Sequence, residues 1–267
     1  PVPDDDDKKW YRVGYASLTV RETPSIIGKV LGTILLDDNL PVLDNTTTPG
    51  WSLIRRVDGL TGWCENKYLV LLSNTRPISI KQNLFKGVTF LQKDLTTPRK
   101  NRMYVMAIDL TTVGIEFLVT PSKIAGGILC TRTTSKFLTE FNMNVAINGD
   151  GFSYLPASVD PVTTCPGGGD PVKANGFAAS RGTVYSPTKT IQPIVYLTSK
   201  NQVTVNGVQN KPFNAVAGDR IVVQGGVKVK NLAALAPSPR TAIGISKNGR
   251  WLIFMVVDGR QEGYSEG

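Results

Sequence analysis

The chain has 267 residues, of which 41% are hydrophobic, and it carries a formal net charge of +9 with no histidine. This length can supply two separate hydrophobic cores, and no apolar run approaches the roughly 18 residues that a membrane-spanning helix requires, so two domains without a membrane span are expected. The absence of histidine excludes a Ser-His-Asp triad, a Cys-His pair and a His-ligated zinc site.

The N-terminal residues Asp4 to Lys8 form a run of charge. We expect this run to be too polar to fold. It matches an enteropeptidase cleavage sequence, so it is either a cloning remnant or a native solvated linker. Nothing before it resembles a signal peptide, and the protein is therefore either cytosolic or has already lost an export signal.

Residues 10–72 contain six short runs that are typical of β-strands and are separated by turn signals such as Asp58-Gly59. The runs cover residues 11–16, 18–21, 28–36, 40–44, 51–57 and 62–65. Cys64 lies within the last run and is predicted to be a small core residue. Five aromatic residues either line a ligand groove or fill the core of this small module. They are Trp10, Tyr15, Trp51, Trp63 and Tyr68.

Several segments of this part resemble the bacterial Src-homology-3-like (SH3-like) domain. They are Leu18-Thr19-Val20-Arg21, Val30-Leu31-Gly32-Thr33, Trp51-Ser52-Leu53-Ile54 and Gly62-Trp63-Cys64-Glu65. The resemblance implies a small SH3-like β-barrel over residues 10–72 that targets cell-wall or envelope components. It therefore favours a secreted or envelope protein whose signal peptide has been removed. Residues 73–83 are polar, include Pro77 and are predicted to be a linker.

Residues 84–267 are predicted to form a larger α+β domain of mainly strands, so that the whole chain is mainly β with some α. Strands are expected at residues 103–110, 114–119, 145–147, 193–198, 203–205, 221–223, 241–246 and 251–258. One amphipathic helix is expected after the capping residues Thr133-Thr134-Ser135. The Pro- and Gly-rich segment 152–174 is expected to be a functional or mobile loop. Cys130 and Cys165 can form a disulfide, which the sequence leaves undecided.

Almost all of the positive charge lies in this second part. Residues 1–72 contain 8 Lys and Arg against 10 Asp and Glu, and the remaining residues contain 22 against 11. The excess favours an anionic partner such as a phosphate-bearing glycan or cell-wall polymer, although a positive surface can also serve solubility alone. The basic residues are scattered and form no stripe with aromatic platforms, which argues against nucleic acid.

Three short elements could carry chemistry, and each also has a purely structural explanation. Asn148-Gly149-Asp150-Gly151 and Asp258-Gly259-Arg260 each follow an apolar run. A carboxylate beside glycines at a strand end can approach a ligand closely, but the same residues also make ordinary tight turns. Arg240 follows Pro239 and suits bidentate contact with phosphate, although a single Arg is also a common surface charge.

Together and in this order, these elements resemble the phosphodiester glycosidase family, which includes the enzyme that uncovers mannose 6-phosphate by removing a phosphate-linked N-acetylglucosamine. The resemblance begins at residues 104–110 and runs to the C-terminal segment 256–267. It implies a glycoside hydrolase that cleaves the sugar-phosphate bond of a phosphodiester in an envelope or extracellular glycan. Asp150 and Asp258 are the implied base or nucleophile. The implied substrate-binding residues are Asn148, Arg240, Arg260, Gly225, Gly226 and Ser265, with the two arginines on the phosphate.

Two departures from the family pattern bear on activity. Gly151 stands where family members often have an aromatic residue. The chain also stops at Gly267, before a helix and an Asp-Gly-Gly-Gly-Ser segment that belong to the family's active centre, so activity of these 267 residues alone is not implied. A non-catalytic protein that binds cell wall or polysaccharide is the alternative. No cofactor is certain, a divalent cation held by Asp side chains stays open, and the sequence does not indicate how many subunits assemble.

Overall fold

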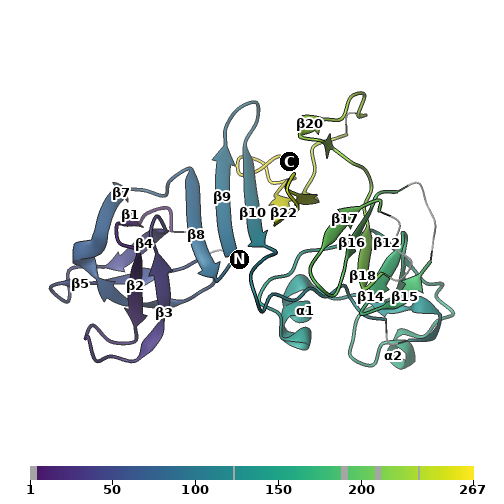
Figure 1. Ribbon diagram of the computed structural model, residues 1–267, viewed down its shortest axis with the longest axis horizontal. Helices are drawn as coiled ribbons and strands as arrows, with labels where there is room; N and C mark the ends of the chain where they lie inside the picture. Colours follow the sequence, from purple (N-terminus) through teal and green to yellow (C-terminus); the bar gives the residue numbers. More distant parts are fainter. Residues whose placement is uncertain (1–4, 123, 188–191, 208–211, 234) are drawn as a thin grey trace. The chain divides into compact units, whose positions relative to one another are not determined.

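The computed structural model describes residues 5–122, 124–187, 192–207, 212–233 and 235–267 (Figure 1). Asp4 of the N-terminal charge run lies outside them. The chain is mainly β with few helices, as predicted. It forms two compact units, and the first contains the residues up to Asp109 together with Pro237–Ala242 and Ile253–Gly267. The second contains Leu110–Ala236 and Ile243–Leu252.

The SH3-like part of the first unit is one sheet with strand order β3-β2-β6-β5-β4-β1-β7. Its elements are β1 (Lys9–Val13), β2 (Ser17–Arg21), β3 (Val30–Leu35), β4 (Asn39–Asp44), β5 (Trp51–Arg55), β6 (Thr61–Glu65), the 3-10 helix η1 (Asn66–Tyr68) and β7 (Leu69–Ser73). Alternate residues of β2, β5 and β6 point into a common core, as expected for strands buried on one face. Cys64 is fully buried in that core, as predicted, and burial raises the pKa of its thiol to about 12.

The five aromatic residues of this part divide between the core and the surface. Trp10 is only 2% exposed and belongs to the interior. Tyr15 is 53% exposed and stacks on Tyr68, with 4.9 Å between the ring centroids. Trp51 and Trp63 are half-buried and alternate along their strands with fully buried residues, so their side chains leave the core. The groove alternative therefore fails for Trp10 and stays open for the other four.

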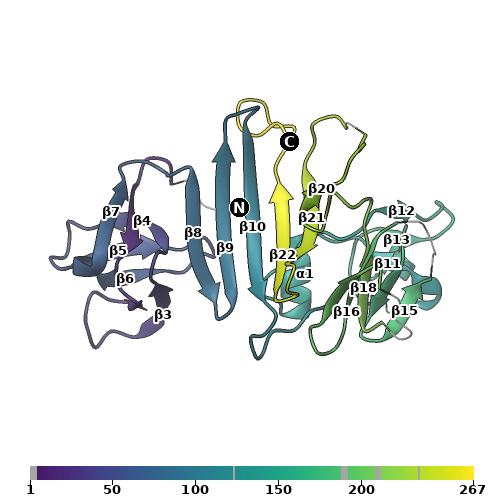
Figure 2. The same cartoon turned by 45° about the horizontal axis from the view of Figure 1, so that its top comes forward.

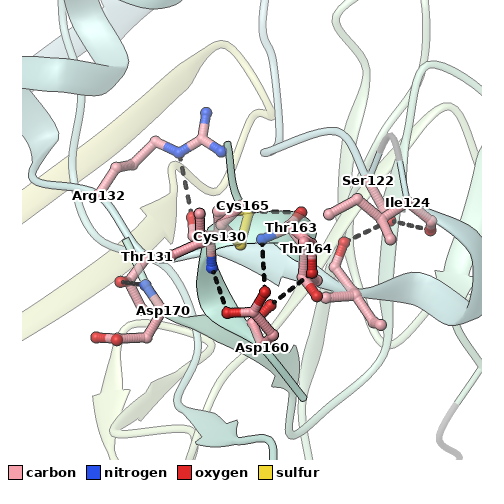
Figure 3. Close-up of a disulfide and its surroundings, with 12 residues drawn as sticks. Ser122, Ile124, Cys130, Thr131, Arg132, Asp160, Thr163, Thr164, Cys165 and Asp170 are labelled. Atoms are coloured by element: carbon pink, nitrogen blue, oxygen red, sulfur yellow. Dashed lines mark hydrogen bonds between the residues drawn. A yellow bond between two sulfur atoms is a disulfide. The ribbon is translucent and has the colours of Figure 1, made fainter. Parts of the chain in front are cut away.

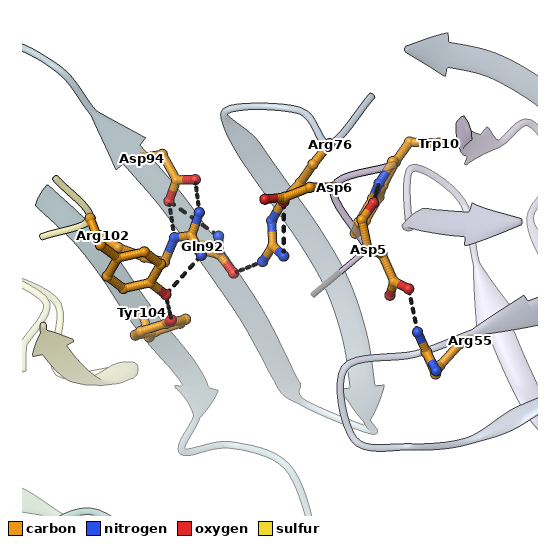
Figure 4. Close-up of polar contacts among 10 residues, drawn as sticks. Asp5, Asp6, Trp10, Arg55, Arg76, Gln92, Asp94, Arg102 and Tyr104 are labelled. Carbon is orange, nitrogen blue, oxygen red and sulfur yellow. Dashed lines mark hydrogen bonds and ion pairs between the residues drawn. The ribbon is translucent and has the colours of Figure 1, made fainter. Parts of the chain in front are cut away.

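The prediction that the N-terminal charge run is too polar to fold is wrong for its described residues. Asp5 is only 4% exposed, and its carboxylate pairs with Arg55. The Trp10 indole donates to the Asp5 carbonyl at 3.2 Å, and Asp6 lies 3.7 Å from the Arg76 guanidinium (Figure 4). Opposite charges supplied by more distant parts of the chain thus order a segment that looks solvated in the sequence.

Two strands that the sequence pattern did not predict follow the SH3-like part. They are β8 (Ser79–Phe85) and β9 (Val88–Leu95), which form a hairpin, so residues 79–83 of the expected linker belong to a strand. Their inward positions include Gln82 and Gln92, which are 0% and 2% exposed. Glutamines at these positions interrupt the apolar alternation by which a strand is normally recognised.

A buried polar network joins β8 to the SH3-like sheet. The Asp38 carboxylate accepts hydrogen bonds from the Leu35 N–H at 2.8 Å, the Asn83 N–H at 2.7 Å and the Asn83 side chain at 2.8 Å. The Gln82 amide donates to the Asn39 carbonyl at 2.8 Å. Because each of these groups is paired within the protein, the network fixes β8 rather than leaving a flexible tether. The domain limits 10–72 and 84–267 stay a prediction.

A five-stranded sheet with the order β21-β22-β10-β9-β8 carries the C-terminal motifs (Figure 2). Its remaining strands are β10 (Asn101–Asp109), β21 (Arg240–Ile245) and β22 (Trp251–Val257). A short turn joins β21 to β22, closed by a bond from the Ser246 N–H to the Trp251 carbonyl at 2.9 Å. In such a hairpin the first residue of β21 and the last residue of β22 lie at the same end of the sheet.

The second unit is built from short strands and two short helices. A three-stranded sheet has the order β11-β13-β12, a five-stranded sheet has the order β15-β14-β18-β16-β17, and β19 pairs with β20. The elements are the 3-10 helix η2 (Ala125–Gly127), β11 (Leu129–Cys130), α1 (Thr134–Phe141), β12 (Phe152–Tyr154), α2 (Pro161–Thr164), β13 (Pro171–Ala174), β14 (Ala178–Ser180), β15 (Thr183–Ser186), β16 (Ile194–Leu197), β17 (Val203–Val205), β18 (Asn214–Ala217), β19 (Val223–Gln224) and β20 (Val227–Lys228). Helix α1 begins as predicted, because the Thr133 hydroxyl accepts a hydrogen bond from the Lys136 N–H at 3.2 Å.

Some expected elements of this unit are wrong. Residues 115–119 form no strand, because side chains satisfy their backbone groups: Asn214 donates to the Phe117 carbonyl at 2.8 Å and Ser180 donates to the Val119 carbonyl at 2.6 Å. Residues 145–147 also form no strand and are only half-buried. The segment 152–174 is not a structureless loop, since it contains β12, α2 and β13.

Candidate active site

Two of the sequence motifs meet in the first unit, at one end of the five-stranded sheet. Asp258 directly follows β22, and Arg240 is the first residue of β21. The Asp258 N–H donates to the Arg102 carbonyl at 3.0 Å, which continues the ladder between β22 and β10. The Arg260 guanidinium donates to the Ser238 hydroxyl at 3.2 Å. The carboxylate and both arginines predicted for phosphodiester chemistry are therefore carried on two adjacent chain segments.

Close backbone packing brings these two segments together. A Cβ atom at residue 259 would lie 2.6 Å from the Pro239 nitrogen and 2.7 Å from the Ser238 carbonyl carbon, so only glycine fits at Gly259. The next residue, Arg260, has φ 59°, in the left-handed region that non-glycine residues rarely adopt. Such a conformation costs about 1–3 kcal/mol and recurs at functional sites, where the surrounding structure enforces it.

Ser265 stabilises the C-terminal turn through the hydrogen bonds of its buried hydroxyl. Its hydroxyl is fully buried, donates to the Asp258 carbonyl at 2.8 Å and accepts from the Arg102 N–H at 3.0 Å. Both bonds go to the backbone, so in this arrangement Ser265 fixes the position of Asp258. Its predicted contact with substrate stays a prediction.

A polar cluster that the sequence did not single out lies beside Asp258. Arg102 of β10 donates to both carboxylate oxygens of Asp94 at 2.9 and 2.8 Å and to the Tyr264 hydroxyl at 2.7 Å. The hydroxyls of Tyr264 and Tyr104 are 3.3 Å apart. Figure 4 shows Arg102, Asp94 and Tyr104 on neighbouring strands. Arg102 and Asp94 lie outside the motifs of the sequence, and Tyr104 and Tyr264 lie in resembling segments that assign them no role. Pairing of β9 with β10 and the fold of the C-terminal turn bring the four residues together.

The Asp258 carboxylate acts on this cluster electrostatically. Burial, the hydrogen bond with Tyr264 and the negative charge of Asp258 raise the pKa of Tyr104 above its ordinary value. Tyr104 therefore keeps its proton at neutral pH and is a hydrogen-bond donor. The cluster thus places two phenols and a guanidinium group beside the Asp258 carboxylate within the first unit.

The predicted residues Asn148 and Asp150 lie in the second unit, on an exposed turn before β12. One carboxylate oxygen of Asp150, Oδ1, accepts from the Gly151 N–H at 2.8 Å. The other, Oδ2, is buried, and no described residue is hydrogen-bonded to it. A Cβ atom at residue 176 would lie 2.5 Å from this oxygen, so Gly176 leaves the room that the carboxylate occupies. A buried carboxylate oxygen without a donor is rare and calls for an explanation.

Gly225 and Gly226 form the two-residue turn between β19 and β20. Both have positive φ values, of 59° and 81°, as a tight hairpin turn requires. No other atom lies within 4 Å of the position that a Cβ would occupy at either residue, so the turn projects from its surroundings among the described residues. Their predicted role in substrate binding stays a prediction.

Comparisons with known families agree with both halves of the sequence analysis. Residues 16–70 match the bacterial SH3 domain, and residues 141–267 match the phosphodiester glycosidase family. The chain combines these two parts. The predicted fusion is thereby confirmed, and all eight predicted site residues lie inside the second match. The resembling residues 104–110 lie outside it. No curated protein matches the chain.

A disulfide joins Cys130, which precedes the segment that matches the phosphodiester glycosidase family, to Cys165, which lies within that segment. Cys130 at the end of β11 is bonded to Cys165 directly after α2, which settles the alternative that the sequence left open (Figure 3). Asp160 caps α2 by accepting from the Val162 and Thr163 N–H groups at 3.0 and 3.2 Å, and these bonds lower the pKa of its carboxyl group. The disulfide encloses residues 131–164, which include the turn that carries Asp150.

The described part of the chain offers neither a ready metal site nor a membrane-spanning helix. It contains no cluster of three or more Cys, Asp or Glu side chains suited to a metal ion. The divalent cation considered from the sequence gains no ligand set from these residues and stays open. None of the described helices has the length and apolar character needed to cross a bilayer.

Proposed function

We propose that the protein is a glycoside hydrolase that cleaves the bond between a sugar and a phosphate in a phosphodiester. The match of residues 141–267 to the phosphodiester glycosidase family supports this class of reaction. The observation that carries the proposal is the Asp258-Gly259-Arg260 turn, whose backbone packs against Ser238-Pro239 and so brings a carboxylate and cationic side chains to one end of the sheet.

The chemistry requires cations for the phosphate and a carboxylate for the sugar carbon or for water. Arg260 and Arg240 bind the phosphate oxygens, for which planar guanidinium groups are well suited. Asp258 activates water or attacks the anomeric carbon, and the bond from that carbon to the phosphate oxygen breaks. The phosphate leaves as an anion stabilised by the arginines, so its departure needs no strong acid.

Asn148 and Asp150 are the proposed sugar-side residues. Asn148 lies on the exposed turn and offers an amide for a sugar hydroxyl. Asp150 is the second carboxylate of the proposed pair. The buried Oδ2 atom of Asp150 accepts no hydrogen bond from the described residues, which costs stability. Groups that cost stability are common at functional sites, and this supports a role for Asp150 in the reaction.

We further propose that the SH3-like part directs this activity to a cell-wall or envelope polymer outside the cytoplasm. The match to the bacterial SH3 domain, the excess of basic residues after residue 72 and the Cys130–Cys165 disulfide support this location. Sedimentation with isolated bacterial cell walls at low salt tests the partner. The protein is expected in the pellet, and a protein that stays in the supernatant contradicts the proposal.

Asp258→Asn tests the reaction itself in the full-length protein. Loss of the carboxylate charge is expected to reduce release of sugar from a sugar phosphodiester by at least about 100-fold. Asp219→Asn is the matched control, because the Asp219 side chain is 74% exposed in a surface pair with Arg220. Retained activity in Asp258→Asn would remove Asp258 from the mechanism. Glycan binding without any sugar release by the unmodified protein would favour the non-catalytic alternative.

A further inference from the structure

The C-terminal turn carries a phenol whose surroundings differ from those of an ordinary surface tyrosine. Tyr264 is 40% exposed, yet its hydroxyl accepts a hydrogen bond from the Arg102 guanidinium at 2.7 Å. The guanidinium carbon also lies 4.4 Å from the centroid of the Tyr264 ring. Arg102 cannot turn away, because Asp94 binds its other nitrogens at 2.9 and 2.8 Å. The Arg102 guanidinium is therefore held in contact with Tyr264.

The Tyr264 oxygen has two hydrogen-bonding neighbours in the cluster, Arg102 and Tyr104. Arg102 has no acceptor, so it must donate to the Tyr264 oxygen. Tyr104 lies 3.3 Å from the same oxygen and is less exposed, and it remains protonated beside Asp258. When Tyr104 also donates, the Tyr264 oxygen accepts two bonds and its own O–H is left available for a further acceptor. Donation to the oxygen polarises that O–H and makes it a stronger donor.

The polarised Tyr264 hydroxyl is suited to bind an anionic oxygen. A phenol polarised by a cation forms its strongest hydrogen bond with a negatively charged acceptor. Tyr264 is four residues from Arg260 on a turn closed by the Arg260 N–H donating to the Glu266 carbonyl at 3.2 Å and by a bridge between Gln261 and Ser265. This short closed turn fixes both side chains on one structural element.

We propose that Tyr264 binds a phosphate oxygen of the substrate through its hydroxyl, with Arg102 and Tyr104 as positioning residues that orient and polarise it. The inference rests on the proposed function for the identity of the anion and extends it by a phosphate ligand that is not an arginine. Asp94 contributes by holding Arg102. No bond is made or broken by these residues, since they act only on the bound phosphate.

Tyr264→Phe tests the proposal, because it keeps the ring over Arg102 and removes only the hydroxyl. Inorganic phosphate is the probe, with binding measured by calorimetry. The substitution is expected to weaken phosphate binding about tenfold, which corresponds to about 1.4 kcal/mol. Tyr154→Phe is the matched control, because Tyr154 is 66% exposed in the second unit, and it should bind phosphate as the unmodified protein does.

Kinetics distinguish a binding role from a structural one. With a sugar phosphodiester, Tyr264→Phe should raise KM about tenfold and change kcat less than threefold, whereas loosening of the turn would lower kcat through Asp258. Tyr104→Phe and Arg102→Lys should each weaken phosphate binding by a smaller factor. Phosphate binding unchanged in Tyr264→Phe, or absent from the unmodified protein, overturns the proposal. Phosphate binding that depends on Tyr264 without any sugar release would contradict the proposed function and leave this inference standing.

Discussion

Two carboxylates, one in each unit, differ in how the protein satisfies their buried oxygens. Asp38 is fully buried and accepts three hydrogen bonds, from Leu35 and Asn83, that join β8 to the SH3-like sheet. Asp150 has a buried oxygen for which the described residues supply no donor. A buried carboxylate oxygen without a donor costs stability and is rare in proteins. The comparison therefore makes Asp150, rather than Asp38, the candidate for a functional role.

The largest expected effect concerns the disulfide around Asp150. The cysteines are 35 residues apart, and breaking this bond by Cys130→Ser with Cys165→Ser should lower the free energy of unfolding by about 3–4 kcal/mol in the chain-entropy model. Urea denaturation measures the change. Dithiothreitol should destabilise the unmodified protein by a similar amount and leave the double variant unchanged. Equal stability of the oxidised and reduced protein would contradict a supporting role for this bond.

Asp38→Asn should have the next largest effect. An amide offers one acceptor oxygen where three donors now converge, so a buried N–H is left unpaired at a cost of about 1–3 kcal/mol. Asp37→Asn is the matched control: the Asp37 side chain is 47% exposed in a surface pair with Arg12, and asparagine tolerates its positive φ of 67°. The free energy of unfolding should change by less than about 0.5 kcal/mol in Asp37→Asn. Equal effects in the two variants would remove Asp38 from the connection between β8 and the SH3-like sheet.

The Asp38→Asn substitution should also change how the free energy of unfolding depends on pH. Burial raises the pKa of Asp38 above its ordinary value of 3.8, although its hydrogen bonds oppose the shift. The folded state therefore binds the proton more tightly than the unfolded state. The stability that this proton contributes is complete below pH 3.8 and is lost as the pH rises through the higher folded pKa. Asp38→Asn should remove this slope from the pH profile of the unfolding free energy.

The sequence predicted those parts of the fold in which local pattern and tertiary structure agree. The strands of the SH3-like part alternate regularly, Cys64 lies at an inward position, and Thr133 caps α1, so each could be predicted from neighbouring residues. Strands β8 and β9 could not, because Gln82 and Gln92 occupy inward positions and depend on partners such as Asn39 and Arg76 elsewhere in the chain. The N-terminal charge run failed for the same reason, since Arg55 and Arg76 neutralise it from far along the chain.

The candidate site was predicted only in part. Asp258 and Arg260 were singled out through the resemblance to the phosphodiester glycosidase family, because an Asp-Gly-Arg sequence after an apolar strand is by itself also typical of an ordinary turn. Arg102, Asp94 and Tyr104 carry no such local signal, since their contacts depend on the pairing of β9, β10 and β22. The unsatisfied oxygen of Asp150 is a property of three-dimensional packing, and sequence alone has no means to show it.

Asp150→Asn distinguishes a structural from a functional role for this carboxylate, because the two roles predict changes of opposite sign in the free energy of unfolding. In the full-length protein it should raise the free energy of unfolding by about 1 kcal/mol, since the buried Oδ2 atom that no described residue contacts with a donor is replaced, and should lower sugar release from a sugar phosphodiester by at least about 100-fold. Asp219→Asn is the control, because the Asp219 side chain is 74% exposed in a surface pair with Arg220, so both quantities should stay nearly unchanged. A destabilised Asp150→Asn variant with full activity would contradict the account.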